Sequence, residues 1–444
     1  MGLNILKVNA EDFGGGANQI ATSLLSEYNK KSHLAKLFVR EKNFDDPKII
    51  QVPNEENRNI FYKLNKILLE KSLNYSLPIL PKVFSKFSLA TEPIRKIKNL
   101  LGFEDFNYPG TNEIISLFGS TIDVIHCHNL HSNFFDLREI ISLSKNFPVF
   151  VTLHDCWMLT GHCVYPYECE KWKKQCNKCP YPSRPIQTTR DACKQNQMRK
   201  KNIYQRSNIH VSAPSKWLLG MAKESILAES CDDFRHIPNG VNEQIFHTGS
   251  KNKARKSLGL PMGQRIVLFI GNGASNNPAK GFNNLLNLVN KLSSKNDCPD
   301  TLFIVLGDQF PMRQYGKNIK MEAHGWISSK KQLVKYFQAS DLYLHLANAE
   351  NFPTAIIEAM HCNLPIIGSK IGGIPEQIKY GYNGFYFENK DIDLISECFS
   401  SVINNDHLLK TLGKNSKTRA MDKFTLSKMT NSYLEWFQEV IERK

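Results

Sequence analysis

The chain of 444 residues has no apolar run approaching the roughly 18 residues that cross a bilayer. Residues 1–8 form a short strand pattern and lack the basic region, apolar core and cleavage site of a secretory leader. Leu6 stands where a myristoylation signal needs Ser or Thr. We therefore expect a cytoplasmic protein. Peripheral contact with an anionic membrane, at the inner face of the cytoplasmic membrane, stays open.

The sequence also lacks the signs of a disulfide framework. Its eleven cysteines are an odd number scattered over a long chain, and a cytosolic protein keeps its thiols reduced. The net charge of +15 fits an acidic partner, such as a nucleotide diphosphate, a phospholipid surface or a nucleic acid. Because the chain has no recognisable nucleic-acid reader motif, we do not expect nucleic acid as a partner.

Short β-branched and aromatic runs alternate with helical patterns along the whole chain. This alternation is typical of parallel sheets and predicts an α/β protein. The runs are 3–8, 34–39, 123–126, 148–153, 209–213 and 234–237, then 265–270, 302–306, 321–326, 342–346, 365–368 and 384–387. A small polar stretch, 248–253, separates the two sets. We predict two Rossmann-like domains, 1–247 and 248–424.

The last residues, 425–444, have the pattern of a helix that docks on another surface. Apolar residues recur at helical spacing after Thr425, which suits an N-cap. Trp436 and Phe437 need a surface to bury against, and we expect this helix to cross back to the N-terminal domain.

Segment 58–100 departs from the alternation, because Lys and Arg are interleaved with Leu, Ile and Phe. Two interpretations stay open. The segment forms helices with one core face and one solvated face, or it forms a basic amphipathic surface that lies on an anionic membrane.

A glycine loop follows the first predicted strand. Gly14, Gly15 and Gly16 stand between that strand and a helical pattern, where backbone N–H groups can approach an anion. Taken alone, this loop fits a structural turn as well as a ligand loop.

A stronger signal follows the predicted strand 342–346. Pro353 suits the first turn of a helix, so the free N–H groups of Thr354 and Ala355 would form a phosphate seat. Glu358 then lies about one turn into the helix, where it can accept hydrogen bonds from a ribose diol. Glu350 stays on the loop and can face a sugar.

The run from 350 to 387 resembles the family 4 glycosyltransferases. Their pattern is E-x7-E, a helix, a strand ending near GGIPE, and then an NG turn, and each element is present in order. Similar motifs extend over most of the chain: Gly14–Ala17, His126–Asn129, Thr152–Trp157, Ala213–Trp217, Ile237–Val241 and Lys280–Phe282. The resemblance implies the GT-B fold, with two Rossmann-like domains facing across a cleft, and retention of anomeric configuration. The most similar subgroup makes bacterial surface polysaccharides of the colanic-acid or capsule type.

The resemblance also implies roles for residues of the C-terminal domain. Lys280 would neutralise the donor diphosphate, which the amides of Thr354 and Ala355 would cap. Glu358 would hold the ribose, and Glu350 would contact the transferred sugar. The backbone of Asn351 and Phe352, which leads to Pro353, would contact the sugar too.

In the N-terminal domain, the resemblance implies that His154 lies near the sugar and the leaving phosphate oxygen. Gly15 and Gly16 would close over the diphosphate. Two departures are Ala279, where the family usually has Arg, and Asn242, where it has Asp.

We therefore expect a retaining hexosyltransferase. It would move a sugar from a nucleotide-diphosphate sugar to a saccharide or lipid-linked acceptor, in the biosynthesis of surface polysaccharide or glycoconjugate. None of the motifs resembles a D-x-D metal site, so we expect no cofactor for catalysis. Cationic and helix-dipole stabilisation of the leaving phosphate would be the main contribution to rate. The alternative is a degenerate GT-B protein that stabilises another transferase.

A cysteine cluster falls in an insert near 156–206. Cys163, Cys169, Cys176 and Cys179 could bind Zn²⁺ tetrahedrally as thiolates, with the last two forming a C-x-x-C half site. We expect a structural zinc, while buried inert thiols and a redox switch remain alternatives. The insert is basic, which fits either a solvated surface or binding of a phosphorylated or lipid-linked acceptor or of a membrane.

Overall fold

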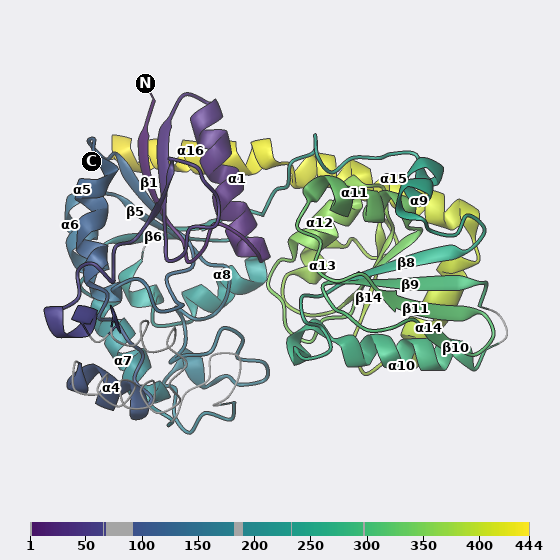
Figure 1. The fold of residues 1–444 in the computed structure, drawn as a ribbon, viewed down its shortest axis with the longest axis horizontal. Helices are drawn as coiled ribbons and strands as arrows, with labels where there is room; N and C mark the ends of the chain where they lie inside the picture. The colour runs from purple at the N-terminus through teal and green to yellow at the C-terminus, as the bar shows by residue number, and fades with distance from the viewer. Residues whose placement is uncertain are drawn as a thin grey trace. The chain divides into compact units, whose positions relative to one another are not determined.

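The computed structural model describes residues 2–64, 66–67, 92–181, 190–231, 233–295 and 298–443. The chain divides into two compact units (Figure 1). Unit 1 comprises Met1–Ala213, Leu218–His236 and Glu435–Lys444, and unit 2 comprises Pro214–Trp217 and Ile237–Leu434. The division at Ile237 falls ahead of the predicted boundary at residue 248, because Val241 and Phe246 are buried in the core of unit 2.

Unit 1 is built on a seven-stranded parallel sheet of order β3-β2-β1-β4-β5-β6-β7. Its strands are β1 (Asn4–Val8), β2 (Leu34–Val39), β3 (Ile49–Gln51), β4 (Val124–Cys127), β5 (Val149–Thr152), β6 (Ile209–Ala213) and β7 (Phe234–His236). Its helices include α1 (Gly16–Lys30), α4 (Pro93–Leu100), α5 (Ile114–Phe118), α6 (Ile140–Asn146) and α7 (Cys193–Tyr204). Helix α8 (Lys216–Lys223) begins in unit 2 and continues into unit 1.

Unit 2 is built on a second seven-stranded sheet, of order β10-β11-β9-β8-β12-β13-β14. Its strands are β8 (Arg265–Ile270), β9 (Thr301–Leu306), β10 (Arg313–Tyr315), β11 (Ile319–Ala323), β12 (Leu342–His345), β13 (Ile366–Ser369) and β14 (Gly384–Phe387). Among the described residues of this sheet, β10 pairs with β11 in antiparallel fashion and the other pairings are parallel. Its helices include α9 (Lys251–Leu258), α10 (Phe282–Ser293), α11 (Lys330–Ala339), α12 (Thr354–His361), α13 (Ile374–Gln377), α14 (Ile392–Ile403) and α15 (Asp406–Lys423).

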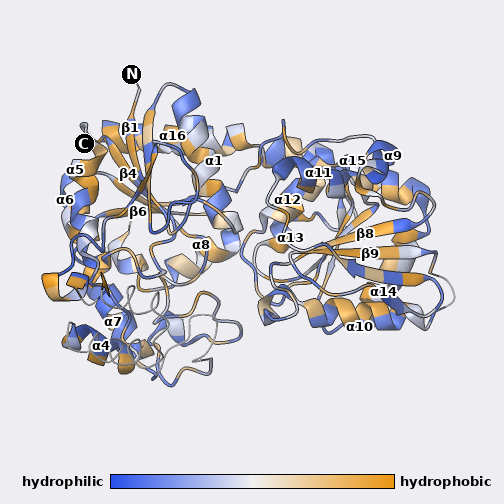
Figure 2. Cartoon of the chain, viewed as in Figure 1, coloured by the Kyte–Doolittle hydropathy of each residue, from blue (hydrophilic) through white to orange (hydrophobic). Residues whose placement is uncertain are grey.

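Helices cover both faces of the sheet in unit 2, and this explains why its central strands, such as β8 and β9, are largely apolar and buried (Figure 2). Ile266 and Leu268 of β8 face a core shared with α11 and α12. Val267 and Phe269 face the opposite core, which includes residues of α10 and α14. Successive strand residues point to opposite faces, so one apolar run supplies both cores.

The predicted C-terminal helix is α16 (Leu426–Glu442), and it ends on unit 1. Trp436 and Phe437 are buried, and both rings pack against Phe150 of β5. The indole N–H of Trp436 donates to Asp233 at 2.7 Å. At the other end, Thr425 Oγ1 accepts the backbone N–H of Lys428 at 3.3 Å, as expected of an N-cap.

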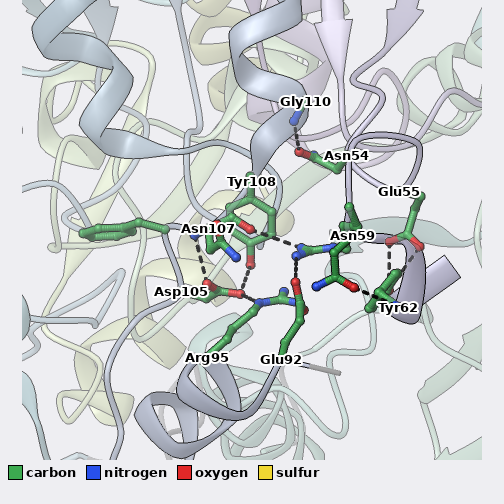
Figure 3. Close-up of polar contacts among 12 residues, drawn as sticks. Asn54, Glu55, Asn59, Tyr62, Glu92, Arg95, Asp105, Asn107, Tyr108 and Gly110 are labelled. Atoms are coloured by element: carbon green, nitrogen blue, oxygen red, sulfur yellow. Dashed lines mark hydrogen bonds and ion pairs between the residues drawn. The ribbon is translucent and has the colours of Figure 1, made fainter. Parts of the chain in front are cut away.

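A buried ion network in unit 1 joins the chain on either side of residues 68–91. Arg58 donates to Glu92 at 2.8 Å, with the side chains only 3% and 9% exposed. Arg95 bonds both Glu92 and Asp105, whose carboxylate also accepts the hydroxyl of Tyr108 at 3.0 Å (Figure 3). Residues 68–91, the middle of the predicted basic segment, lie outside the described residues. No helix in the described ranges is long and apolar enough to span a bilayer.

Candidate active site

The candidate site of unit 2 lies where the strand order reverses. Strand β8 has β9 on one side and β12 on the other, and open α/β sheets bind ligands outside the carboxyl ends of such strands. Lys280 follows β8 and Glu350 follows β12. The fold brings these two predicted residues together, with Lys280 Nζ donating to Glu350 Oε1 at 2.5 Å.

The loop that carries Lys280 is pressed against the loop that follows β12. The carbonyl of Ala279 accepts the N–H groups of Asn348 and Ala349, at 2.8 and 3.2 Å. Gly281 has a φ of +71°, and a Cβ there would lie 1.8 Å from the carbonyl oxygen of Leu346. Only glycine fits this approach, so the Lys-Gly pair serves the packing as well as the charge.

The two glycines of the GGIPE motif support the loop that carries Glu350. Gly372 has a φ of +51°, and a Cβ there would lie 2.0 Å from the carbonyl oxygen of Glu350. The N–H of Gly373 donates to the Asn351 carbonyl at 2.7 Å. The side chain of Asn351 is buried and accepts the hydroxyl of Ser215 at 2.6 Å. The loop is therefore fixed before any ligand binds.

Glu350 is ionised in this setting. Burial alone would raise its pKa, but the charge of Lys280 and the hydrogen bond from its ammonium outweigh burial and lower the pKa. His345 was not among the predicted site residues. Burial lowers its pKa to about 4, and its buried Nε2 has no hydrogen-bond partner in the described part of the chain. The sequence did contain a signal for this site residue, because His345 is a polar residue at the carboxyl end of an apolar strand.

Helix α12 starts at Thr354, so Pro353 is its N-cap and lies just before the first turn, not within it as predicted. The opening N–H groups of a helix, here those of Thr354 and Ala355, lack intrahelical partners and favour an anion. Phe352, which precedes Pro353, is buried and its ring packs against that of Phe424.

Glu358 lies on α12 and is only 4% exposed. Burial raises the pKa of its carboxyl to about 7, and Lys330 opposes this shift only in part. Within the described ranges, the carboxyl accepts no hydrogen bond from another residue. Buried polar groups normally have a partner, so this carboxyl is suited to hydroxyl donors from a ligand.

His154 follows β5 in unit 1 and ends a chain of buried polar groups. Its Nε2 lies 3.0 Å from Nδ1 of His128, whose Nε2 lies 2.9 Å from Nζ of Lys7. Burial lowers the pKa of Lys7 far below its ordinary value and that of His154 to about 4. A neutral His154 imidazole suits hydrogen bonding to a hydroxyl. The contact of Lys7 with His128 depends on side-chain packing and was not predicted.

The glycine loop of unit 1 also lies where the strand order reverses, between β1 and β4. Gly15 is the N-cap of α1, and Gly16 is its first residue. Gly14 has a φ of +99°, which favours glycine, whereas a Cβ on Gly15 would meet nothing within 4 Å. Packing within the described structure therefore does not require glycine at position 15.

The four cysteines of the predicted zinc site line one pocket in unit 1. Within the described ranges, however, no three His, Cys, Asp or Glu side chains are already arranged to hold a metal ion.

Comparisons with known proteins agree with this architecture. Residues 250–419 match the family described as glycosyl transferases group 1. The N-acetyl-alpha-D-glucosaminyl L-malate synthase of Bacillus anthracis is 24% identical over 233 residues, 52% of this chain and 60% of that protein. The UDP-Gal:alpha-D-GlcNAc-diphosphoundecaprenol alpha-1,3-galactosyltransferase of Escherichia coli is 26% identical over 219 residues, 47% of this chain and 54% of that protein. The chain thus spans little more than half the length of these two relatives.

The whole chain resembles solved structures. The crystal structure of HepE from Anabaena in complex with UDP and glucose has a TM-score of 0.63 and 16% sequence identity, over 98% of this chain and 99% of that chain. At 16% sequence identity, this structural similarity is evidence for the fold alone. Together with the two Rossmann-like sheets, it confirms the predicted GT-B class.

Proposed function

We propose that this protein is a glycosyltransferase that uses a nucleotide-diphosphate sugar as donor. One observation carries the proposal: Glu358, a buried carboxyl without a hydrogen-bond donor among the described residues, stands on the helix that directly follows the loop carrying Glu350, the partner of Lys280. Ribose hydroxyls would satisfy Glu358, while a diphosphate would meet the helix N-terminus and an ammonium group. The match of residues 250–419 to glycosyl transferases supports this assignment.

For the reaction, we propose hexosyl transfer with retention and without a catalytic metal. As the bond between sugar and nucleotide breaks, negative charge grows on the leaving phosphate, where Lys280 and the N–H groups of α12 would stabilise it. Glu350, held ionised, would orient the transferred sugar. The name of the Escherichia coli relative describes an alpha-linked product made from UDP-Gal. The same name supports a lipid-linked saccharide as the acceptor class.

We also propose that the protein contacts membranes from unit 1. Exposed Ile60, Phe61 and Leu64 precede residues 68–91, and exposed Ile94 and Ile97 follow them. Lysines are interleaved with these residues in the sequence, and this combination suits an anionic bilayer surface. Flotation with anionic vesicles tests this contact, since an absence of binding at low salt would contradict it.

A thermal-shift panel with UDP, GDP, ADP and their common sugars tests the donor site. A ligand at about 100 times its Kd should stabilise the protein by roughly 2.7 kcal/mol, which raises the melting temperature by several degrees. We expect a shift with one nucleotide class, and its loss in Glu358→Ala. No shift with any nucleotide would contradict the proposal and favour the degenerate partner of another transferase.

A further inference from the structure

Most of the segment between β5 and α7 has no regular secondary structure. Among its described residues, 153–181 and 190–192, only Lys171–Lys173 form a 3-10 turn. The apolar cluster there has three buried members, Trp172, Cys176 and Cys193, with Cys179 and Met221 packed against it. The start of the segment, from Leu153 to Leu159, is buried in unit 1, whereas the part around the cysteines has only this small apolar cluster. An irregular segment with few apolar contacts can take further stability from a metal or disulfides.

The pocket in this segment is lined by sulfur. Cys163, Cys169, Cys176 and Cys179 line it together, with His162 and Cys193 at the same pocket. None of the five cysteines is in a disulfide. Cys179 Sγ lies 3.8 Å from Nε2 of His162.

Hydrogen bonds hold the backbone of the C-x-x-C turn in one conformation. Lys178, inside the turn, has a φ of +41°, the left-handed region that non-glycine residues rarely adopt. The ammonium of Lys171 closes the turn by donating to the carbonyls of residues 177 and 178, at 3.1 and 2.9 Å. The backbone N–H groups of Cys176 and Cys179 donate to Gln197 and Asp191, at 2.6 and 2.8 Å.

We infer that Cys163, Cys169, Cys176 and Cys179 form a structural zinc site that fixes this segment. Four thiolates complete the tetrahedral set that structural zinc prefers. Cys193 is excluded because its side chain is hydrogen-bonded to Asp191. Binding closes the pocket, drawing the four sulfurs to about 2.3 Å from the metal.

Metal analysis of the full chain, purified without chelator, tests the site. We expect about one zinc per chain in the wild type, and a loss of most of it in Cys176→Ser and Cys179→Ser. Cys398→Ser is the matched control, because Cys398 is half-buried and free, like Cys179, but lies on α14 in unit 2. It should retain the zinc.

A second measurement covers the case in which the variants do not fold. The wild type is stripped with a chelator and titrated with Co²⁺, and intense ligand-field absorption with thiolate charge transfer is expected at about one equivalent. Less than about 0.2 zinc per chain together with no such spectrum would overturn the inference. So would a disulfide between Cys176 and Cys179 in freshly purified protein. Neither measurement involves a nucleotide, so failure here is distinct from failure of the donor site.

Discussion

Replacing Glu358 by Gln should stabilise the ligand-free protein at alkaline pH. The pKa of this carboxyl is about 7 in the folded chain, against an ordinary value of 4.5. Below the ordinary value both states are protonated, so folding incurs no ionisation cost. Between pH 4.5 and 7 the unfolded chain loses this proton while the folded chain keeps it, so the stability of the fold falls, and above pH 7 the loss levels off. At pH 8 the loss is about 3 kcal/mol, which the neutral amide of Gln avoids.

The assay is denaturant unfolding of the wild type and Glu358→Gln at pH 5 and pH 8. The difference in free energy of unfolding should grow from about 1 kcal/mol at pH 5 to about 3 kcal/mol at pH 8. Glu397→Gln, at an exposed position of α14, is the control and should show no such growth. An equal effect of Glu358→Gln at both pH values would refute the burial argument.

Three further substitutions test the packing of the site and of the last helix. Lys280→Ala should raise the pKa of Glu350 and weaken nucleotide binding by about tenfold or more, measured by calorimetry; unchanged affinity would contradict the assigned role. Gly281→Ala forces a Cβ against the Leu346 carbonyl at positive φ, and should lower the free energy of unfolding by more than about 1 kcal/mol. Trp436→Ala removes a ring buried on unit 1 and should cost about 3 to 5 kcal/mol, and a loss below about 1 kcal/mol would argue against the docking of α16.

Much of the fold follows from the sequence, because buried parallel strands are continuous apolar runs. Every predicted run contains a strand of the structure, within a few residues at its ends. The two strands that were missed, β3 and β10, are three residues long and lie at sheet edges. Edge strands need no continuous apolar run, so their pairing depends on the sheet that is already formed.

The site was predictable where a local motif defines it and not where distant side chains meet. Lys280, Glu350 and Glu358 belong to motifs, and the fold places them around β8, β12 and α12. The contact of Ser215 with Asn351, and the approach of Lys7 to His128, join residues more than a hundred positions apart. No local spacing encodes such contacts.

The proposed glycosyltransferase activity is tested by measuring the release of nucleoside diphosphate from UDP-, GDP- and ADP-sugars, with a mixture of saccharide and lipid-linked acceptors. The wild type and Lys280→Ala are compared under the same conditions. We predict release from sugars of one nucleotide class by the wild type, raised by acceptor and strongly reduced in the variant. Binding of a nucleotide without release from any donor would contradict the proposed activity.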